Sequence, residues 1–68
     1  MMKIQINGNK VEMPDEVRTI EELLVYYKLD DKPVIVEWNK EIVDKDNHTK
    51  TVLTEEDQVE IVHFVGGG

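Results

Sequence analysis

Apolar and polar residues alternate at the start of the chain, with the period of half-buried β-strands. The apolar positions of this alternation are Met2, Ile4, Ile6, Val11 and Met13. Asn7-Gly8 interrupts it, and these two residues tolerate the positive φ angles of a type I′ hairpin turn. Residues 2–13 therefore predict an N-terminal β-hairpin.

The period then changes to that of an amphipathic helix. Its apolar stripe consists of Ile20, Leu23, Leu24 and Tyr27. Thr19 and Glu22 have the spacing of a capping box, which satisfies free N–H groups at a helix start. We expect the helix to begin at Thr19 and to end near Lys28 or Leu29, because Pro33 cannot continue it.

The segment PVIVEWNKEIV predicts a second hairpin. One face carries Val34, Val36 and Trp38, and the other carries Ile35 and Glu37. Asn39-Lys40 supplies a weaker turn than Asn-Gly, because the Cβ of lysine resists positive φ. Ile42 and Val43 follow as a short strand.

A polar segment over residues 44–53 predicts an irregular loop in which His48 is solvated. A last strand follows over residues 58–64. If Val59 and Ile61 face the helix, then Val62 and Phe64 point outward, and outward apolar residues often mark a binding face. The alternative, that these two residues extend the core, stays open.

Two histidines and two tyrosines are further candidates for a functional role. His63 would face the core side near the end of the last strand, as a structural histidine with its hydrogen bonds satisfied. Tyr26 and Tyr27 would form an edge of the core rather than stack on a cofactor. No spacing of possible ligands around His48 matches a known metal site.

The elements occur in the order hairpin, helix, hairpin, loop, strand. Their apolar faces are too small to be buried separately, so we expect one sheet packed on one helix. The fold class is α+β, with a mixed sheet of four or five strands. The strongly apolar first and last strands should lie side by side and parallel within it.

Composition excludes several functions. The 68 residues contain no cysteine and no serine, which argues against thiolate metal sites and against a hydrolase. The net charge of −7, with one arginine, argues against nucleic acid. No apolar run approaches 18 residues, and the start lacks a signal-peptide pattern, so we expect a cytoplasmic protein that does not enter membranes.

The Asn7-Gly8 hairpin, the segment VIVEWNKEIV and the ending DQVEIVHFVGGG together resemble the ThiS family, the sulfur carriers of thiamin biosynthesis. The resemblance covers essentially the whole chain and implies a ubiquitin-like β-grasp fold. Lys40 departs from the glycine that is usual in that turn of the family.

The resemblance also implies a function. Gly68 would be adenylated by a ThiF-type enzyme and converted to a thiocarboxylate, which donates sulfur to a ThiG-type thiazole synthase. Gly66 and Gly67 would enter the partner's active site. The chain would then be a β-grasp domain over residues 1–65 with a flexible glycine tail over residues 66–68, a monomer when free, without a cofactor or a metal, and not an enzyme.

Two other functions stay open at this point. One is a sulfur carrier for molybdopterin synthesis, and the other is a ubiquitin-like modifier joined to lysines of other proteins. Folded bodies and glycine ends of these classes look alike, so the fold alone does not separate them.

Overall fold

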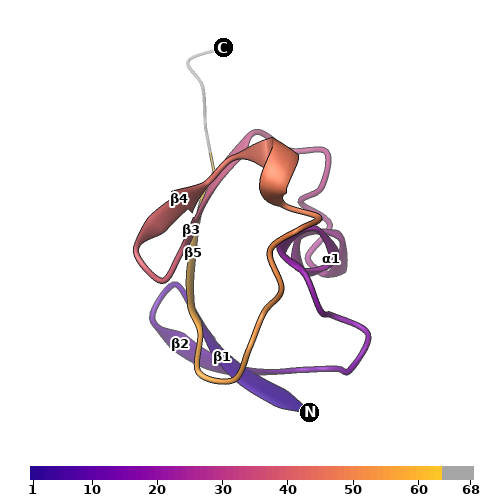
Figure 1. The fold of residues 1–68 in the computed structure, drawn as a ribbon, viewed down its shortest axis with the longest axis vertical. Coiled ribbons are helices and arrows are strands. Elements are labelled where there is room, and N and C mark those ends of the chain that lie inside the picture. The colour runs from indigo at the N-terminus through magenta and orange to yellow at the C-terminus, as the bar shows by residue number, and fades with distance from the viewer. Residues whose placement is uncertain (64–68) are drawn as a thin grey trace.

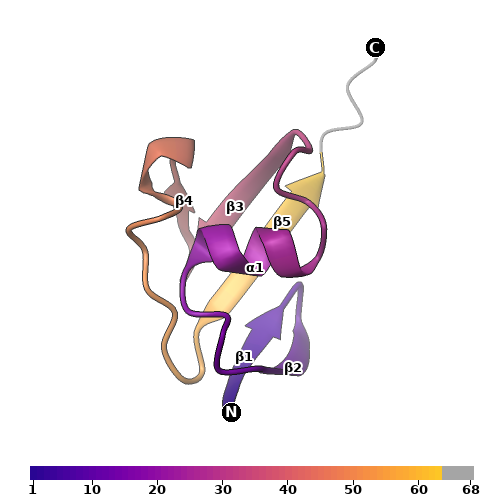
Figure 2. The same cartoon turned by 90° about the vertical axis from the view of Figure 1, so that its right-hand side faces the viewer.

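The computed structural model describes residues 1–63, and the chain forms one five-stranded mixed sheet with a helix across one face (Figures 1 and 2). The elements are β1 (Met2–Ile6), β2 (Asn9–Met13), α1 (Ile20–Tyr26), β3 (Val34–Trp38), β4 (Glu41–Val43), the 3₁₀ turn η1 (Lys45–Asn47) and β5 (Gln58–His63). The strand order is β2-β1-β5-β3-β4. β5 is parallel to β1 and antiparallel to β3, so the predicted pairing of the first and last strands is confirmed.

Both hairpins use two-residue turns with positive φ at each position. The angles are 50° at Asn7 and 85° at Gly8 in the first turn, and 51° at Asn39 and 72° at Lys40 in the second. These values fit type I′ turns, whose twist matches that of the flanking strands. Lys40 therefore adopts the conformation usually left to glycine.

The capping box at the start of α1 is confirmed. The Glu22 amide donates to Thr19 Oγ1 at 3.2 Å, and the Thr19 amide donates to Glu22 Oε1 at 3.1 Å. Carbonyl groups of the loop before β5 accept the remaining free N–H groups: Ile20 donates to Thr51 at 3.1 Å and Glu21 to His48 at 3.0 Å. Every amide of the first turn thus has a partner, as a buried helix start requires.

The predicted end of α1 was two to three residues too late. The helix ends at Tyr26, and Lys28 has a φ of 60°. The Lys28 amide donates to the Val25 carbonyl at 2.9 Å and the Leu29 amide to the Leu24 carbonyl at 2.7 Å. This pair of bonds is a Schellman motif, which ends the helix seven residues before Pro33.

The core lies between α1 and the inner face of the sheet. Its buried members are Ile4, Met13, Val17, Ile20, Leu23, Leu24, Val36, Leu53 and Val59. The predicted helical stripe is confirmed except at Tyr27, which is exposed. Val34 and Trp38 pack against the same core as Val36, as their shared face predicted.

The loop between β4 and β5 is more ordered than predicted. It contains η1, an isolated bridge between Thr19 and Val52, and the core residue Leu53. The prediction of a solvated His48 was wrong, because its side chain is only 5% exposed. The loop folds back over the start of α1, where its carbonyls meet the helix amides, and that contact buries the imidazole.

Asp57 is a buried carboxylate that ties the second hairpin to the start of β5. Its oxygens accept hydrogen bonds from Trp38 Nε1 at 2.8 Å, Asn39 Nδ2 at 3.1 Å, the Thr54 amide at 2.8 Å and Thr54 Oγ1 at 3.0 Å. Burial alone would raise the pKa of Asp57, but these hydrogen bonds favour the ionised form and hold its pKa below the ordinary 3.8.

The first prediction concerns this carboxylate. Asp57→Ala should lower the free energy of unfolding by about 3 kcal/mol, because several buried donors lose their acceptor. The pKa is lower in the folded chain, so the stabilisation is present above pH 3.8 and is lost as the pH falls through the folded value. Urea unfolding at several pH values measures both effects.

The matched control for this prediction is Asp31→Ala, at an exposed aspartate. It should leave both the stability and its pH dependence nearly unchanged. Wild-type stability in Asp57→Ala would contradict the role given to Asp57.

Candidate functional site

β5 positions the outward residue that the sequence singled out. Val59 is 1% exposed and contributes to the core with Ile61, whereas Val62 is 51% exposed. The outward orientation of Val62 is therefore confirmed. Phe64, the second residue predicted on this face, lies outside the described residues.

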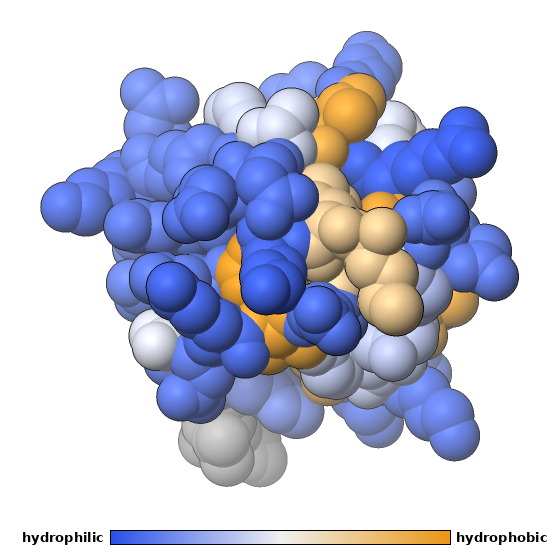
Figure 3. Space-filling model, turned by 90° about the horizontal axis from the view of Figure 1, so that it is seen from below, coloured by the Kyte–Doolittle hydropathy of each residue, from blue (hydrophilic) through white to orange (hydrophobic). Residues whose placement is uncertain are grey.

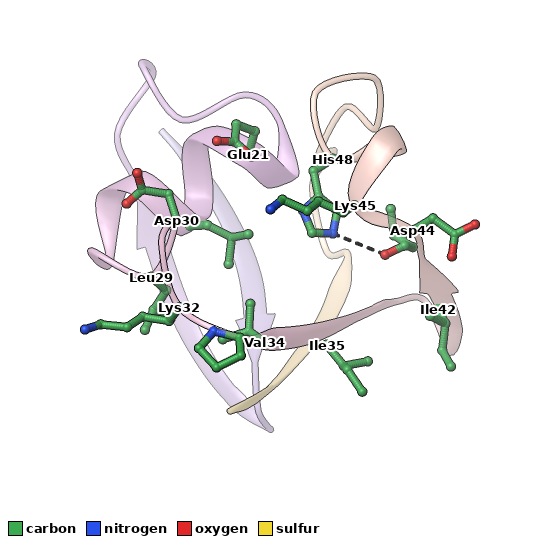
Figure 4. Close-up of a pocket in the computed structure, with 13 residues that line it drawn as sticks. Glu21, Leu29, Asp30, Lys32, Val34, Ile35, Ile42, Asp44, Lys45 and His48 are labelled. Carbon is green, nitrogen blue, oxygen red and sulfur yellow. Dashed lines mark hydrogen bonds between the residues drawn. The ribbon is translucent and has the colours of Figure 1, made fainter. Parts of the chain in front are cut away.

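Val62 is joined on the outer face by apolar residues of the second hairpin. Ile35 is its direct cross-strand partner on β3, and Ile42 on β4 is 66% exposed. Figure 4 shows Ile35 and Ile42 on the side of these strands that faces away from His48. We call Val62, Ile35 and Ile42 the Val62 face.

The sequence pattern placed Ile35 on the face opposite Val36 and Trp38 but did not join it to Val62. The β3–β5 register makes that connection, and neither segment alone specifies it. The same register pairs Glu37 with Glu60, so acidic side chains lie beside the apolar ones. An apolar surface with an acidic border suits a partner whose own apolar patch is bordered by Lys or Arg.

The end of β5 borders a cavity of about 340 Å³ between the first hairpin and the end of α1. Its lining is Ile6, Asn7, Asn9, Val11, Tyr27, Leu29, Ile61 and His63. His63 is on the same side of β5 as Ile61, as predicted, but it is exposed. Within residues 1–63, no hydrogen bond to the His63 ring occurs, so its role as a structural histidine stays a prediction.

The tyrosine pair is likewise more exposed than predicted. Tyr26 and Tyr27 are 51% and 38% exposed, and their rings meet edge to face with centroids 5.2 Å apart. The pKa of Tyr27 is raised above its ordinary value. Partial burial is the larger cause, and the neighbouring Tyr26 is the smaller one. The two rings contact each other rather than forming an edge of the core.

A second cavity, of about 280 Å³, lies between α1, the second hairpin and η1. Figure 4 shows that His48 faces the β4 backbone from above, and its Nε2 lies 3.1 Å from the Val43 carbonyl oxygen. Because a carbonyl can only accept, Nε2 carries the proton of this bond. Across residues 1–63, no three His, Cys, Asp or Glu side chains are grouped so that they could hold a metal ion.

The end of the molecule at which the N-terminus lies is mainly hydrophilic, with a small apolar area in the middle (Figure 3). A cavity of about 200 Å³ at this end is lined by Met2, Pro14, Asp15, Val17, Arg18, Val52 and Leu53. It lies beyond the start of β5, far from His63. None of the helices in the described part of the chain is long and apolar enough to span a membrane.

Gly66, Gly67 and Gly68 lie outside the described residues, as does the predicted boundary after residue 65. The described part of the chain ends at His63, the last residue of β5, which borders the cavity beside the first hairpin.

Comparison with known proteins gives a consistent result. The ThiS family model matches residues 4–68, a range that includes the three glycines. The chain is 48% identical over 65 residues to the sulfur carrier protein ThiS of Bacillus subtilis, covering 96% of this chain and 98% of that protein. A crystal structure of the thiamine biosynthesis protein ThiS from Geobacter metallireducens matches with a TM-score of 0.82 and 29% identity, over 98% of this chain and all of that one.

A second group of relatives is much longer. The chain is 40% identical over 67 residues to a thiazole synthase of Magnetococcus marinus and spans 20% of its length. A thiazole synthase of Paramagnetospirillum magneticum is 39% identical over 67 residues, again over 20% of its length. In these proteins, a segment similar to this chain is part of the thiazole synthase polypeptide.

One substitution made at two positions of β5 tests the two faces of this strand. Val59→Thr should lower the free energy of unfolding by about 1–3 kcal/mol, because it buries a hydroxyl group at a position only 1% exposed. Val62→Thr should change it by less than about 0.5 kcal/mol. Urea unfolding measures both, and equal losses would show that Val62 is part of the core.

Proposed function

The chain belongs to the ThiS family, and from this membership we propose that it carries sulfur on the carboxyl group of Gly68. The observation that carries the proposal is its 48% identity to a sulfur carrier protein, over nearly the full length of both chains. A carrier of this kind is a co-substrate of other enzymes and not itself an enzyme. The sulfur serves synthesis of the thiazole part of thiamin.

The proposed chemistry starts from a carboxylate that is ionised at pH 7, since its ordinary pKa is about 3.5. Its negative charge makes it a poor electrophile. Attack of a carboxylate oxygen on the α-phosphorus of ATP releases pyrophosphate and forms an acyl-adenylate. A nucleophile at the oxidation level of sulfide, such as HS⁻, then adds to the acyl carbon and AMP leaves, which yields the thiocarboxylate.

The composition of the chain supports this position for the sulfur. No cysteine is present to hold a persulfide, so a terminal carboxyl group is the remaining place for a covalently carried sulfur atom. Gly66 and Gly67 lack a Cβ, which lets the backbone enter a narrow channel and leaves the neighbouring acyl carbon unhindered. We assign residues 1–65 to the folded domain and residues 66–68 to this reactive end.

Two kinds of partner are needed by this chemistry. A ThiF-type enzyme would adenylate Gly68, and a ThiG-type thiazole synthase would accept the sulfur. The ThiS-like segment within the thiazole synthase relatives supports the second partner. We propose that the Val62 face, together with Phe64, is the surface on which they dock.

We propose that the protein is cytoplasmic, because the proposed adenylation uses ATP. A net charge of −7 opposes association of like copies, which supports a monomer when the chain is free. The two other functions considered from the sequence, molybdopterin synthesis and protein modification, gain no support from the relatives described above.

The main test of the proposal removes the reacting residue. The full chain is incubated with the ThiF-type enzyme, ATP and a sulfur donor, and its intact mass is measured. The wild type should exchange one oxygen for one sulfur. The Gly68 deletion should react at least about 100-fold more slowly, because its new carboxyl group stops about 3.5 Å short of the phosphate.

Gly67→Val provides a variant of unchanged length. It should also fail to react, because a branched Cβ would enter a channel shaped for glycine. Both variants should unfold at the wild-type urea concentration. Sulfur transfer that persists in the Gly68 deletion would place the chemistry at another residue and end this proposal.

A second test concerns the docking surface. Val62→Lys should weaken binding to the ThiF-type enzyme at least about tenfold, since a charge would be desolvated within an apolar contact. Gln58→Lys is the matched control, because it adds the same charge to the same side of β5 at the other end of the strand. Isothermal titration of the free chain gives both dissociation constants, and equal values would remove the Val62 face as the docking surface.

A further inference from the structure

Asn7 holds the backbone of β5 with both polar atoms of its side chain. Its Oδ1 accepts a hydrogen bond from the Ile61 amide at 2.8 Å, and its Nδ2 donates to the Ile61 carbonyl at 3.3 Å. These two residues are separated by 54 positions in the sequence. By binding both the amide and the carbonyl of Ile61, the Asn7 side chain makes the hydrogen bonds that a neighbouring strand would otherwise make at this residue.

The turn of the first hairpin explains why the side chain of Asn7, and not its backbone, binds Ile61. The parallel ladder pairs Ile6 with Val59, and the Asn7 amide donates to the Val59 carbonyl at 2.9 Å. A straight ladder would next offer the backbone carbonyl of Asn7 to the Ile61 amide. The chain instead turns away at Asn7, where φ is 50°. The Asn7 side chain therefore makes the hydrogen bonds to the amide and the carbonyl of Ile61.

Within residues 1–63, this contact is the last hydrogen bond that β5 makes on the side of β1. Ile61 is three residues before Phe64 and seven before Gly68. Val62 is held independently, since β3 pairs with β5 through Ile35–Val62 and Val34–His63. Loss of the contact with Asn7 would therefore leave the end of β5 without this hydrogen bonding on the side of β1, while Val62 stays paired with β3.

The second hairpin provides an internal comparison. Asn39 occupies the same position of an equivalent turn, with a φ of 51°. Its Oδ1 accepts from the Gln58 amide at 2.9 Å, so it holds the start of β5 as Asn7 holds the end. The two asparagines hold opposite ends of the strand, and Nδ2 donates to the Asp57 carboxylate in Asn39 but to the Ile61 carbonyl in Asn7.

We propose that Asn7 is a positioning residue for the sulfur-carrying end: its contact with Ile61 fixes the direction in which the chain leaves β5 toward Gly68. This inference rests on the proposed function of Gly68. The reaction needs the terminal carboxylate within near-contact distance of the α-phosphorus, so a change in the direction of the preceding strand lowers the fraction of bound molecules that can react.

Asn7→Gly tests this proposal, because glycine keeps the positive φ of the turn and removes only the side-chain contact. In the adenylation assay with the ThiF-type enzyme, kcat should fall about tenfold, while KM stays within about twofold of the wild type. Exchange of the Ile61 amide with solvent, followed by NMR, should become faster. Both measurements use the full chain.

Two further variants separate positioning from stability. Asn39→Gly makes the same change in the same kind of turn; it should lower the thermal midpoint and leave kcat unchanged below that midpoint. Asn7→Asp keeps an acceptor for the Ile61 amide and tolerates positive φ, so it should recover most of kcat. If Asn7→Gly unfolds, the proposal is judged on Asn7→Asp, whose kcat should lie below the wild type and above zero.

Wild-type kcat in a folded Asn7→Gly variant would overturn the proposal, and so would an equal fall of kcat in Asn39→Gly. Absence of adenylation in the wild type would instead contradict the proposed function of Gly68. The two failures are therefore distinguishable in one set of assays.

Discussion

The pairing of β5 on both edges is the constraint on which the rest of the structure depends. β5 joins β1 in parallel and β3 in the antiparallel direction, so it links two hairpins that do not otherwise share a ladder. An isolated hairpin is marginally stable in water, and a parallel pair needs a long connection. The chain from β2 to β5 supplies that connection and places α1 over the inner face (Figure 2).

Polar side chains strengthen this arrangement at the two ends of β5. Asn39 and Asp57 hold its start, and Asn7 holds its end. Each asparagine first forms a turn that needs positive φ and then uses its side chain to bind the central strand. Glycine would fit the turn but could not bind β5 through a side chain. The turn sequence alone therefore does not indicate this second role.

The sequence predicted the local elements better than the contacts between them. The capping box at Thr19 and the alternation along β5 are encoded within a few residues, and both are confirmed. The end of α1 was missed because Lys28 adopts a left-handed conformation that its side chain does not favour. The burial of His48 and Asp57 depends on the fold of the loop before β5, so no short pattern indicated it.

Val62 precedes Gly68 by six positions in the sequence, and this short separation limits how far the two residues can lie apart. Because side chains alternate along β5, the residues that anchor it in the core and the exposed Val62 are neighbours in sequence. Gly68 is six positions after Val62, a distance that the extended chain spans with at most about 20 Å. If a partner binds the Val62 face as proposed, the carboxyl group of Gly68 lies within that distance of Val62, and the proposed role of Asn7 is to narrow the search within it.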